Sequence, residues 1–301
     1  LARGVANPDE LDLGLRAMQP PGKLAGIDRA AALIADAVQQ DRSILVVGDF
    51  DADGATGTAL AVLALRAMGG QRVTFRVPNR FEFGYGLTAG LVGTLAGEPP
   101  DVLVTVDSGI NCNAGVEAAR QLGCSVVVTD HHLPGEVLPP ADAIVNPNQP
   151  DDRFPSKALA GVGVMFYLLG AVRSLLRERG WFGPRRREPQ LAQFLDLVAL
   201  GTVADLVPLD HNNRILVEQG LKRIRAGRCR PDTACAEGRI AGGAHQLFGL
   251  FPRLDHRDKD GLCPGIHRTG TQQKKDQQDT QHHDTRREYP YCGRPQPGQA
   301  C

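Results

Sequence analysis

A short segment near the start of the chain joins an apolar run to closely spaced acids. Residues 46–48, Val-Val-Gly, lead directly into Asp49, Asp51 and Asp53, and Gly54 follows. Continuous apolar runs are typical of strands that are buried on both faces of a parallel sheet. Such sheets bind their ligands outside the carboxyl ends of the strands. The three carboxylates therefore stand where an α/β protein would bind a metal ion.

Acids and histidines also follow other apolar segments. Residues 102–106 are followed by Asp107, and residues 125–129 are followed by an Asp-His-His triplet. A two-metal hydrolase holds its ions about 3.5 to 4 Å apart and needs several hard oxygen ligands. Histidine nitrogens in such a set favour manganese over magnesium. The groups that could complete the site begun at residues 49–53 are Asp107, Asp130, His131, His132 and Asp205.

The residues alone leave other interpretations of the acidic segment open. A calcium loop of EF-hand type begins D-x-D-x-D-G but needs a bidentate Glu at its twelfth position, which here is Leu60. Residues 51–54 also fit the D-x-D-G nucleophile loop of haloacid dehalogenase phosphatases, although the later Asp-His-His triplet does not. Singly, Asp107 or Asp205 could cap a helix, and either histidine could be a core residue. The convergence of several such groups favours the two-metal site.

Alternating strands and helices must position these groups. The predicted strands are residues 43–48, 73–77, 102–106 and 125–129. A helix is predicted before the first strand, at residues 26–40, and others between the strands, at residues 54–68, 88–95 and 114–122. This alternation predicts an α/β fold with a doubly wound, mostly parallel sheet. A helical section should follow the sheet, at residues 159–179, 191–203 and 213–225.

The chain is predicted to divide into three parts. Residues 1–25 form an N-terminal segment, residues 26–230 the domain that carries the acids, and residues 231–301 a tail. The tail contains no valine, although valine fills the strands upstream. Its low hydrophobicity cannot offset the entropy of ordering the chain, so we expect disorder. We expect the chain, which starts at Leu1, to be a fragment of a longer protein. Our hypothesis for its tail is a frameshift, which the nucleotide sequence would test.

Composition excludes several classes of protein. The 34 Lys and Arg residues balance 34 Asp and Glu residues, so nucleic acid would bind through a local patch and not through an overall field. Three consecutive arginines end the loop at residues 181–187, where a solvated loop is favoured over a phosphate contact. No apolar stretch approaches the roughly 18 residues that span a bilayer, so we expect a cytoplasmic protein without a membrane partner. Seven cysteines without a C-x-x-C pair predict neither a zinc framework nor disulfides.

Four segments resemble, in order, the four motifs of the DHH phosphoesterase family. They are Asp49-Phe50-Asp51-Ala52-Asp53-Gly54, Asp107-Ser108-Gly109-Ile110, Asp130-His131-His132 and Gly201-Thr202-Val203-Ala204-Asp205. Within that family the flanking residues are similar to those of the RecJ-like exonucleases. These flanks are Pro78-Asn79-Arg80, Gly84-Tyr85-Gly86-Leu87, residues 160–164, residues 203–209 and Asn213-Arg214. The resemblance covers roughly residues 20–231 and identifies residues 26–230 as a DHH phosphoesterase catalytic domain.

The resemblance implies a site with two Mn2+ or Mg2+ ions. Asp107 is expected to bridge the ions, and water that they activate would attack phosphorus in line. His132 is expected to contact the scissile phosphate, and Arg80 to grip a 5′-terminal phosphate through its guanidinium fork. The predicted catalytic residues are Asp107, His131 and His132. The predicted metal ligands are Asp49, Asp51, Asp53, Asp107, Asp130, His131 and Asp205.

The reaction implied by the resemblance is metal-dependent 5′-to-3′ hydrolysis of single-stranded DNA to 5′-mononucleotides, in recombination and repair. The implied partners are single-stranded DNA, a single-strand-binding protein and a recombination helicase. Two alternatives stay open: a DHH phosphoesterase for oligonucleotides or cyclic dinucleotides, and an inactive fragment that binds metal or DNA without turnover. The resembling enzymes also carry a second globular domain and an OB-fold. Neither is predicted here, and residues 242–245, Gly-Gly-Ala-His, are interpreted as a coincidental match to a phosphate-binding motif.

Overall fold

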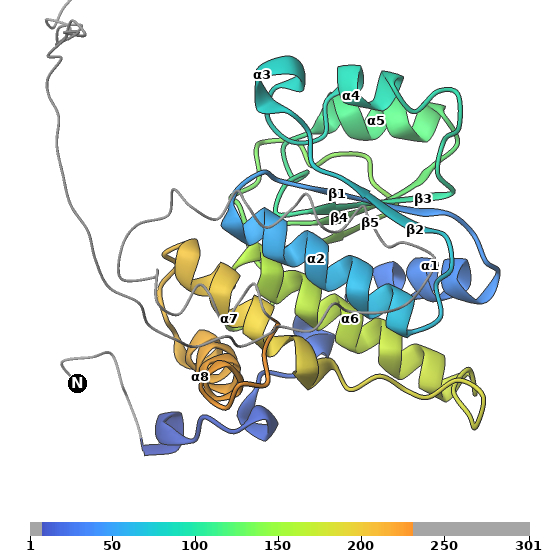
Figure 1. The fold of residues 1–301 in the computed structure, drawn as a ribbon. Helices are drawn as coiled ribbons and strands as arrows, with labels where there is room; N and C mark the ends of the chain where they lie inside the picture. The colour runs from blue at the N-terminus through green and yellow to red at the C-terminus, as the bar shows by residue number, and fades with distance from the viewer. Residues whose placement is uncertain (1–7, 231–301) are drawn as a thin grey trace, which may run out of the picture. The chain divides into compact units, whose positions relative to one another are not determined.

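The computed structural model describes residues 8–230, which contain a parallel sheet with helices on both faces (Figure 1). Within these residues the sheet has five strands in the order β2-β1-β3-β4-β5, and every neighbouring pair is parallel. The predicted α/β fold is therefore confirmed. The strands are β1 (Ile44–Gly48), β2 (Val73–Arg76), β3 (Val102–Val106), β4 (Ser125–Thr129) and β5 (Ala143–Val145). β5 has three residues and is not among the predicted strands.

The inner strands β1, β3 and β4 owe their largely apolar sequences to burial on both faces. Side chains of a strand point alternately to the two faces of its sheet. In β1, Val46 lies in the larger hydrophobic cluster, whereas Leu45 and Val47 lie in the smaller one. All five residues of β1 are buried. The sheet therefore separates two cores, as expected for a doubly wound fold.

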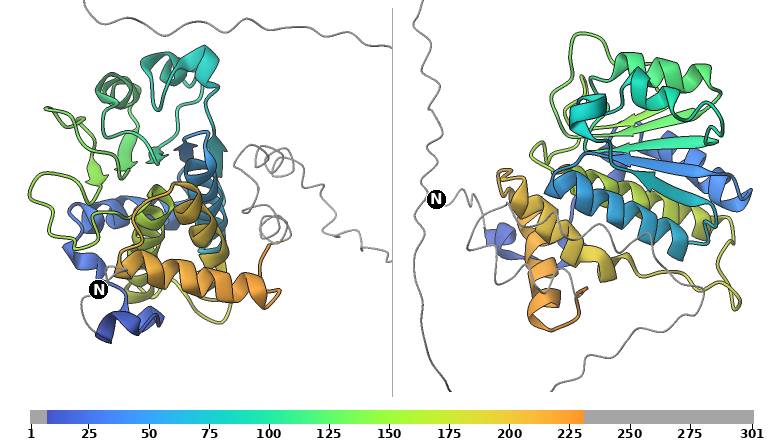
Figure 2. Two further views of the ribbon diagram at one scale, coloured as in Figure 1. Left: turned by 90° about the vertical axis from the view of Figure 1, so that its left-hand side faces the viewer. Right: turned by 45° about the horizontal axis from the view of Figure 1, so that its top comes forward.

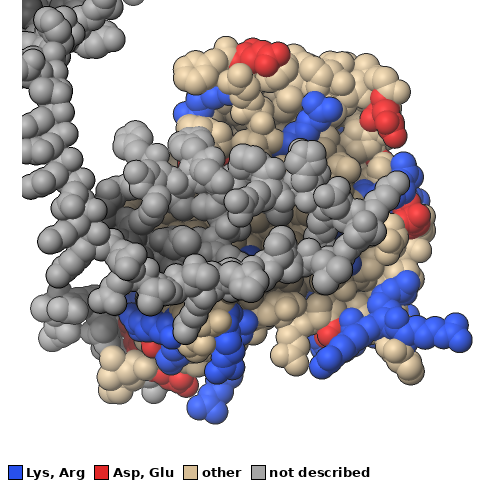
Figure 3. Space-filling view, viewed as in Figure 1, with Lys and Arg blue, Asp and Glu red and all other residues tan. Residues whose placement is uncertain are grey.

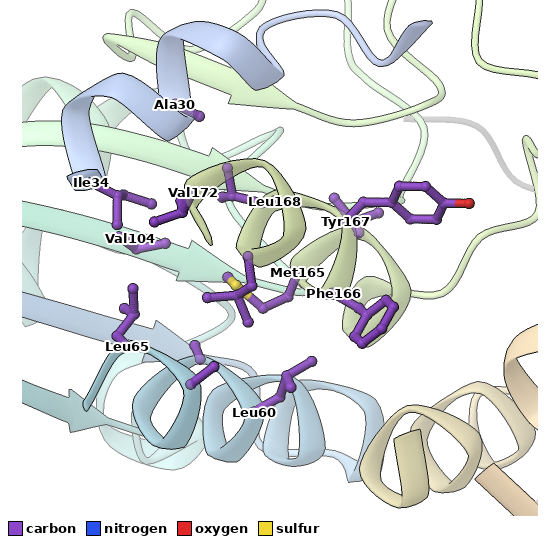
Figure 4. Packing of buried hydrophobic residues seen from close by; sticks show 14 of the residues in the cluster. Ala30, Ile34, Leu60, Leu65, Val104, Met165, Phe166, Tyr167, Leu168 and Val172 are labelled. Carbon is purple, nitrogen blue, oxygen red and sulfur yellow. The ribbon is translucent and has the colours of Figure 1, made fainter. Parts of the chain in front are cut away.

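Helices cover both faces of the sheet (Figure 2). On one face lie α1 (Ile27–Gln39), α2 (Ala52–Ala67) and α6 (Gly161–Glu178). On the other lie the short helices α4 (Ala89–Gly93) and α5 (Asn113–Gln121). Figure 4 shows Met165 and Leu168 of α6 among side chains from α1, α2 and the sheet. Helix α6 is thus central to the larger core.

The predicted helical section follows the sheet. Its first predicted helix is α6, which packs on a face of the sheet, and the others are η4 (Leu191–Phe194) with α7 (Leu195–Ala204), and α8 (His211–Arg225). Helix α3 (Arg80–Phe83) is a single turn inside the loop after β2. Three 3-10 turns lie N-terminal to α1: η1 (Pro8–Leu11), η2 (Leu15–Ala17) and η3 (Pro21–Lys23). The part of this segment that contains η1 is attached to α8, since Arg214 pairs with Glu10 at 2.7 Å and the Gln219 side-chain amide donates to the Leu13 carbonyl at 2.6 Å.

The arginine-containing loop at residues 181–187 lies far from the acidic segment. Trp181 Nε1 donates a hydrogen bond to the Met68 carbonyl just after α2, and the Arg186 guanidinium stacks 3.6 Å from the Trp181 ring centroid. Helix α2 begins at the acidic segment and has 16 residues, so its far end is about 24 Å away at about 1.5 Å per residue. Figure 3 shows basic side chains gathered along the lower edge of the visible face, beside acidic ones. Arg186 therefore packs on Trp181, at the end of α2 that is far from the acidic segment.

Some predictions concern parts of the chain that the structure does not describe. The disordered or frameshifted tail predicted at residues 231–301 lies outside the described residues. The domain boundaries next to residues 26 and 230 stay predictions. Among residues 8–230, no helix combines the length and the apolar character needed to cross a bilayer.

Gly220→Ala is expected to destabilise the helical section by about 1 to 3 kcal/mol, because overpacking a close contact forces the backbone apart. A Cβ at this position in α8 would overlap the Leu195 carbonyl oxygen and the Ala199 side chain of α7. Urea unfolding measures the loss. Gly170→Ala in α6 is the matched control, since a Cβ there meets nothing within 4 Å. That control should be neutral or gain up to about 1 kcal/mol of helix propensity, and equal losses in both variants would contradict the packing argument.

Candidate metal centre

The acidic segment forms the connection between β1 and α2. Asp51 caps the helix, because its carboxylate accepts a hydrogen bond from the Gly54 amide at 3.0 Å. Asp53 lies in the first turn of α2. A Cβ on Gly54 would stand 2.6 Å from the Asp49 carbonyl oxygen, so the helix can begin this close to the strand only with glycine here. The spacing of the motif thus fixes three carboxylates at one strand end.

Asp53 joins this segment to the first residues of α6. Its two carboxylate oxygens accept hydrogen bonds from the amides of Gly161 at 2.6 Å and Val162 at 2.9 Å. The free amides and partial positive charge of a helix N-terminus stabilise a carboxylate. A Cβ on Gly161 would stand 2.7 Å from the Asp107 side chain, so glycine permits the approach. Burial, followed by the charge of Asp107, raises the pKa of Asp53 well above its ordinary value.

Asp107 follows β3 in an unusual backbone conformation. Its φ of 59° lies in the left-handed region, which residues other than glycine seldom adopt. The turn is held by Thr105, whose hydroxyl donates to the Ser108 carbonyl at 2.7 Å. Burial, and then the charges of Asp51 and Asp130, raise the pKa of Asp107 to about 9. A carboxyl group that is so costly to ionise is suited to contact with a cation.

His131 brings four separate elements together. Its Nε2 atom lies 3.1 Å from Asp107 Oδ1, 3.5 Å from Asp205 Oδ2 and 4.0 Å from Asp53 Oδ2. The four residues stand after β4, after β3, at the end of α7 and at the start of α2. Four of the predicted site residues therefore meet at one point.

The donor atoms at this point fit a divalent cation. Three of them are buried and have no hydrogen-bond partner within the described part of the chain: Asp107 Oδ1, His131 Nε2 and Asp205 Oδ2. Buried polar atoms in folded proteins are nearly always paired. Carboxylate oxygens with an imidazole nitrogen are donors that suit manganese and related divalent ions. Among residues 8–230, sets of donor atoms within 4.8 Å of one another include Asp53, His131 and Asp205, then Asp49, Asp51 and Asp107, and also Asp107, His131 and His132.

Asp130 contacts His132 and nearby backbone amides. Its Oδ1 atom accepts hydrogen bonds from His132 Nδ1 at 2.7 Å and from the amides of His131 and His132 at 2.7 and 3.1 Å. Its Oδ2 atom accepts one from the Ile110 amide at 2.9 Å. Burial alone would raise the pKa of Asp130, but these hydrogen bonds lower it. The geometry makes Asp130 an orienting partner of His132, and its role as a metal ligand stays a prediction.

His132 is more readily protonated because of this contact. The hydrogen bond to Asp130 raises the pKa of His132 above its ordinary value. The side chain is 46% exposed, so it can reach a ligand outside the cluster. A carboxylate that accepts a hydrogen bond from one ring nitrogen fixes the orientation and the tautomer of an imidazole. His132 is therefore oriented and exposed so that it can bind an anion.

Arg80 stands beside the same carboxylates. It begins α3, whose N-cap Asn79 accepts a hydrogen bond from the Phe81 amide at 3.1 Å. Arg80 Nη2 lies 3.4 Å from Asp49 Oδ2. Burial raises the pKa of Asp49 in spite of this pair. The structure thus places the predicted phosphate-binding arginine next to the predicted metal site.

Two residues of the site are absent from the sequence prediction. Asn146 Nδ2 donates to the His132 carbonyl at 2.9 Å, and Asn148 Nδ2 donates to the His131 carbonyl at 2.6 Å. They follow β5, the strand that the sequence pattern misses. Had β5 been recognised, a polar Asn-Pro-Asn sequence directly after it would have marked them.

Known proteins place these residues in a family context. Residues 43–202 match the model described as "DHH family, N-terminal domain". The chain is 59% identical over 272 residues to the "Single-stranded-DNA-specific exonuclease RecJ" of Dickeya dadantii. That alignment covers 88% of this chain and 47% of the relative. The chain therefore spans about half the length of this curated relative.

Solved structures give the same indication. A crystal structure of the exonuclease RecJ bound to manganese is similar with a TM-score of 0.60 and 38% identity, over 74% of this chain and 55% of that one. RecJ of Thermus thermophilus in complex with Mg2+ is similar with a TM-score of 0.51 and 32% identity, over 79% of this chain and 29% of that one. Both relatives are metal-bound.

Without metal, the stability of the chain is expected to fall as pH rises. The pKa of Asp107 is about 9 in the folded chain against an ordinary value of 3.8. The folded state therefore holds an extra proton between these values, and its stabilisation is lost as pH rises toward 9. Asp107→Asn resembles the protonated form, so the stability of this variant should fall less steeply with pH. Melting temperatures of both proteins in EDTA, from about pH 6 to about pH 9, measure this dependence.

Added Mn2+ should reverse this trend, because metal binding requires ionised carboxylates. Wild-type melting temperatures should rise most at the alkaline end, whereas Asp107→Asn should respond little. An unchanged pH slope in Asp107→Asn, or an equal response to Mn2+, would show that Asp107 is not the group responsible.

Proposed function

Because this chain belongs to the DHH family, we propose that it is the catalytic domain of a metal-dependent exonuclease of the RecJ type. It removes 5′-mononucleotides from the 5′ end of single-stranded DNA, in recombination and repair. The observation that carries the proposal is the meeting of three buried ligand atoms that lack a hydrogen-bond partner in the described part of the chain, from Asp107, His131 and Asp205. The 59% identity to a single-stranded-DNA-specific exonuclease supports the choice of substrate.

In this proposal the resident ions are Mn2+ or Mg2+, both of which occur in structures of similar RecJ proteins. Divalent ions at such a site polarise a phosphate and activate water. The chain's carboxylates balance that charge, and Asp53 remains fixed by the α6 amides while it does so. The residues that would hold the ions are Asp51, Asp53, Asp107, His131 and Asp205, with Asp49 beside them.

His132 binds the scissile phosphate as a cation. Its raised pKa favours the protonated ring near neutral pH, where a phosphodiester is anionic. Asp130 holds the ring by the 2.7 Å hydrogen bond to Nδ1, so the other nitrogen can donate toward substrate. Charge that develops on the phosphate is opposed by a donor already in place.

Arg80 binds the 5′-terminal phosphate. Its side chain is 44% exposed, and its guanidinium fork suits two phosphate oxygens at once. Tyr85 lies near both phosphate-binding groups: its ring is 5.2 Å from the Arg80 guanidinium carbon and 6.3 Å from the His132 ring. Binding of the terminal and the scissile phosphate by groups around one tyrosine suits release of one nucleotide at a time.

The proposal extends to the setting of the reaction. The chain acts in the cytoplasm on single-stranded DNA, and a single-strand-binding protein and a recombination helicase are its proposed partners. Support for these two partners comes only from the family resemblance. The chain spans about half the length of the Dickeya dadantii relative, and in this proposal it is one part of such an enzyme.

The central experiment supplies Mn2+ and three 5′-labelled substrates: a long single strand, a duplex and a dinucleotide. Mononucleotide release confined to the single strand is the expected result. Asp107→Ala should abolish release, because it removes a buried ligand atom of the cluster. Preference for the dinucleotide would favour a DHH phosphoesterase of short substrates. Absence of turnover on all three, with normal Mn2+ binding, would leave an inactive fragment.

Arg80→Ala should lower the preference for a 5′-phosphorylated end by about ten- to hundredfold, the range expected for a lost charged hydrogen bond. The ratio of kcat/KM on 5′-phosphorylated and 5′-hydroxyl strands measures it. Arg72→Ala is the matched control, because Arg72 is exposed and precedes β2, at the amino end of the strand, whereas Arg80 follows its carboxyl end. An equal loss on both strand ends would contradict the role of Arg80.

A further inference from the structure

Phe50 occupies an unusual place for an aromatic residue. It lies between Asp49 and Asp51, immediately after β1. Its side chain is half-buried and belongs to neither of the hydrophobic clusters found in residues 8–230. Phenylalanine is usually retained for the apolar surface that it buries in a core. The ring therefore lies beside the acidic segment, outside both clusters.

The Phe50 ring faces the Arg80 guanidinium. The guanidinium carbon lies 3.6 Å from the ring centroid, well inside the roughly 6 Å range of a cation–π contact. Asp49, which precedes Phe50 in the sequence, pairs with Arg80 Nη2. Phe50 thus contacts the arginine of the Arg80–Asp49 pair through its ring.

The remaining contacts hold Arg80 less firmly. The Nη2–Oδ2 distance to Asp49 is 3.4 Å, beyond the usual range of a hydrogen bond between nitrogen and oxygen. Tyr85 is farther away, at 5.2 Å from ring centroid to guanidinium carbon. A long, partly exposed arginine loses much conformational entropy when it is fixed in one place. Among these three contacts, the stacking on Phe50 is therefore the closest restraint on the guanidinium plane.

Stacking and phosphate binding use different parts of a guanidinium. An aromatic ring contacts its flat face, whereas a phosphate accepts hydrogen bonds from the N–H groups at its edge. Arg80 can therefore remain on Phe50 while it binds an anion. A lysine could not be held in this way, because its ammonium group has no plane.

We propose that Phe50 is a positioning residue that holds the Arg80 guanidinium ready for the 5′-terminal phosphate. The inference rests on the proposed function, in which Arg80 binds that phosphate. It assigns the aromatic residue of the first motif a part in recognising the end of the strand. The carboxylates on either side of Phe50 serve the metal ions, so one short segment contributes to both tasks.

The test compares the full chain with Phe50→Leu, which keeps an apolar side chain but removes the aromatic face. Rates in Mn2+ are measured on single strands with a 5′-phosphate or a 5′-hydroxyl end. Phe50→Leu should lower the preference for the phosphorylated end by about three- to thirtyfold, as expected for loss of a cation–π contact. The change should appear in KM more than in kcat. Phe50→Tyr should retain the preference, and melting curves establish that both variants are folded.

A double variant separates positioning from a general structural effect. Phe50→Leu combined with Arg80→Ala should be no worse than Arg80→Ala alone, because the ring acts through that arginine. An unchanged preference in Phe50→Leu, an equal loss on both strand ends, or additive losses in the double variant would overturn the inference. If only the inference is wrong, the wild type still cleaves single strands and prefers the phosphorylated end. A wild type without cleavage or without that preference overturns the proposed function of Arg80 together with the inference.

Discussion

Like charges gathered at one edge of the sheet are the constraint on which the rest of the structure depends. Asp49, Asp53 and Asp107 are all buried, and burial raises the pKa of each. Ionised groups in such surroundings repel one another and lack the hydration that water would give them. They are tolerated where amides, imidazoles, a guanidinium or a cation oppose them. The fold supplies the first three from elements that are distant in the sequence.

The helices are arranged to provide that opposition. Both α2 and α6 begin at the acidic cluster, so their amide-rich ends face it. Close approach requires small residues, as a Cβ on Gly161 would meet Asp107 and one on Gly201 of α7 would stand 3.0 Å from Asp53 Oδ1. The same helices carry the apolar side chains of the larger core. Charge compensation and hydrophobic packing therefore determine one arrangement together.

Local features of the sequence predict much of this fold and site. An apolar run that ends in an acid is visible without knowledge of the partner strand, which is why β1, β3 and β4 and the carboxylates after them are predictable. A strand as short as β5 gives no such pattern, so Asn146 and Asn148 escape recognition. Nor does sequence reveal which way a carboxylate points. Asp130 follows an apolar strand just as Asp107 does, yet the hydrogen bonds that Asp130 accepts come from His132 and backbone amides.

Val162 shows how tightly chemistry and architecture are joined. Its side chain is buried in the larger core, while its amide donates to Asp53 at 2.9 Å. Any repacking that moves the first turn of α6 therefore also moves the amides that hold a carboxylate of the candidate metal site. Protein engineers who seek heat resistance through core substitutions here would disturb the candidate metal site at the same time. Thermal robustness should be sought instead on surfaces remote from that turn.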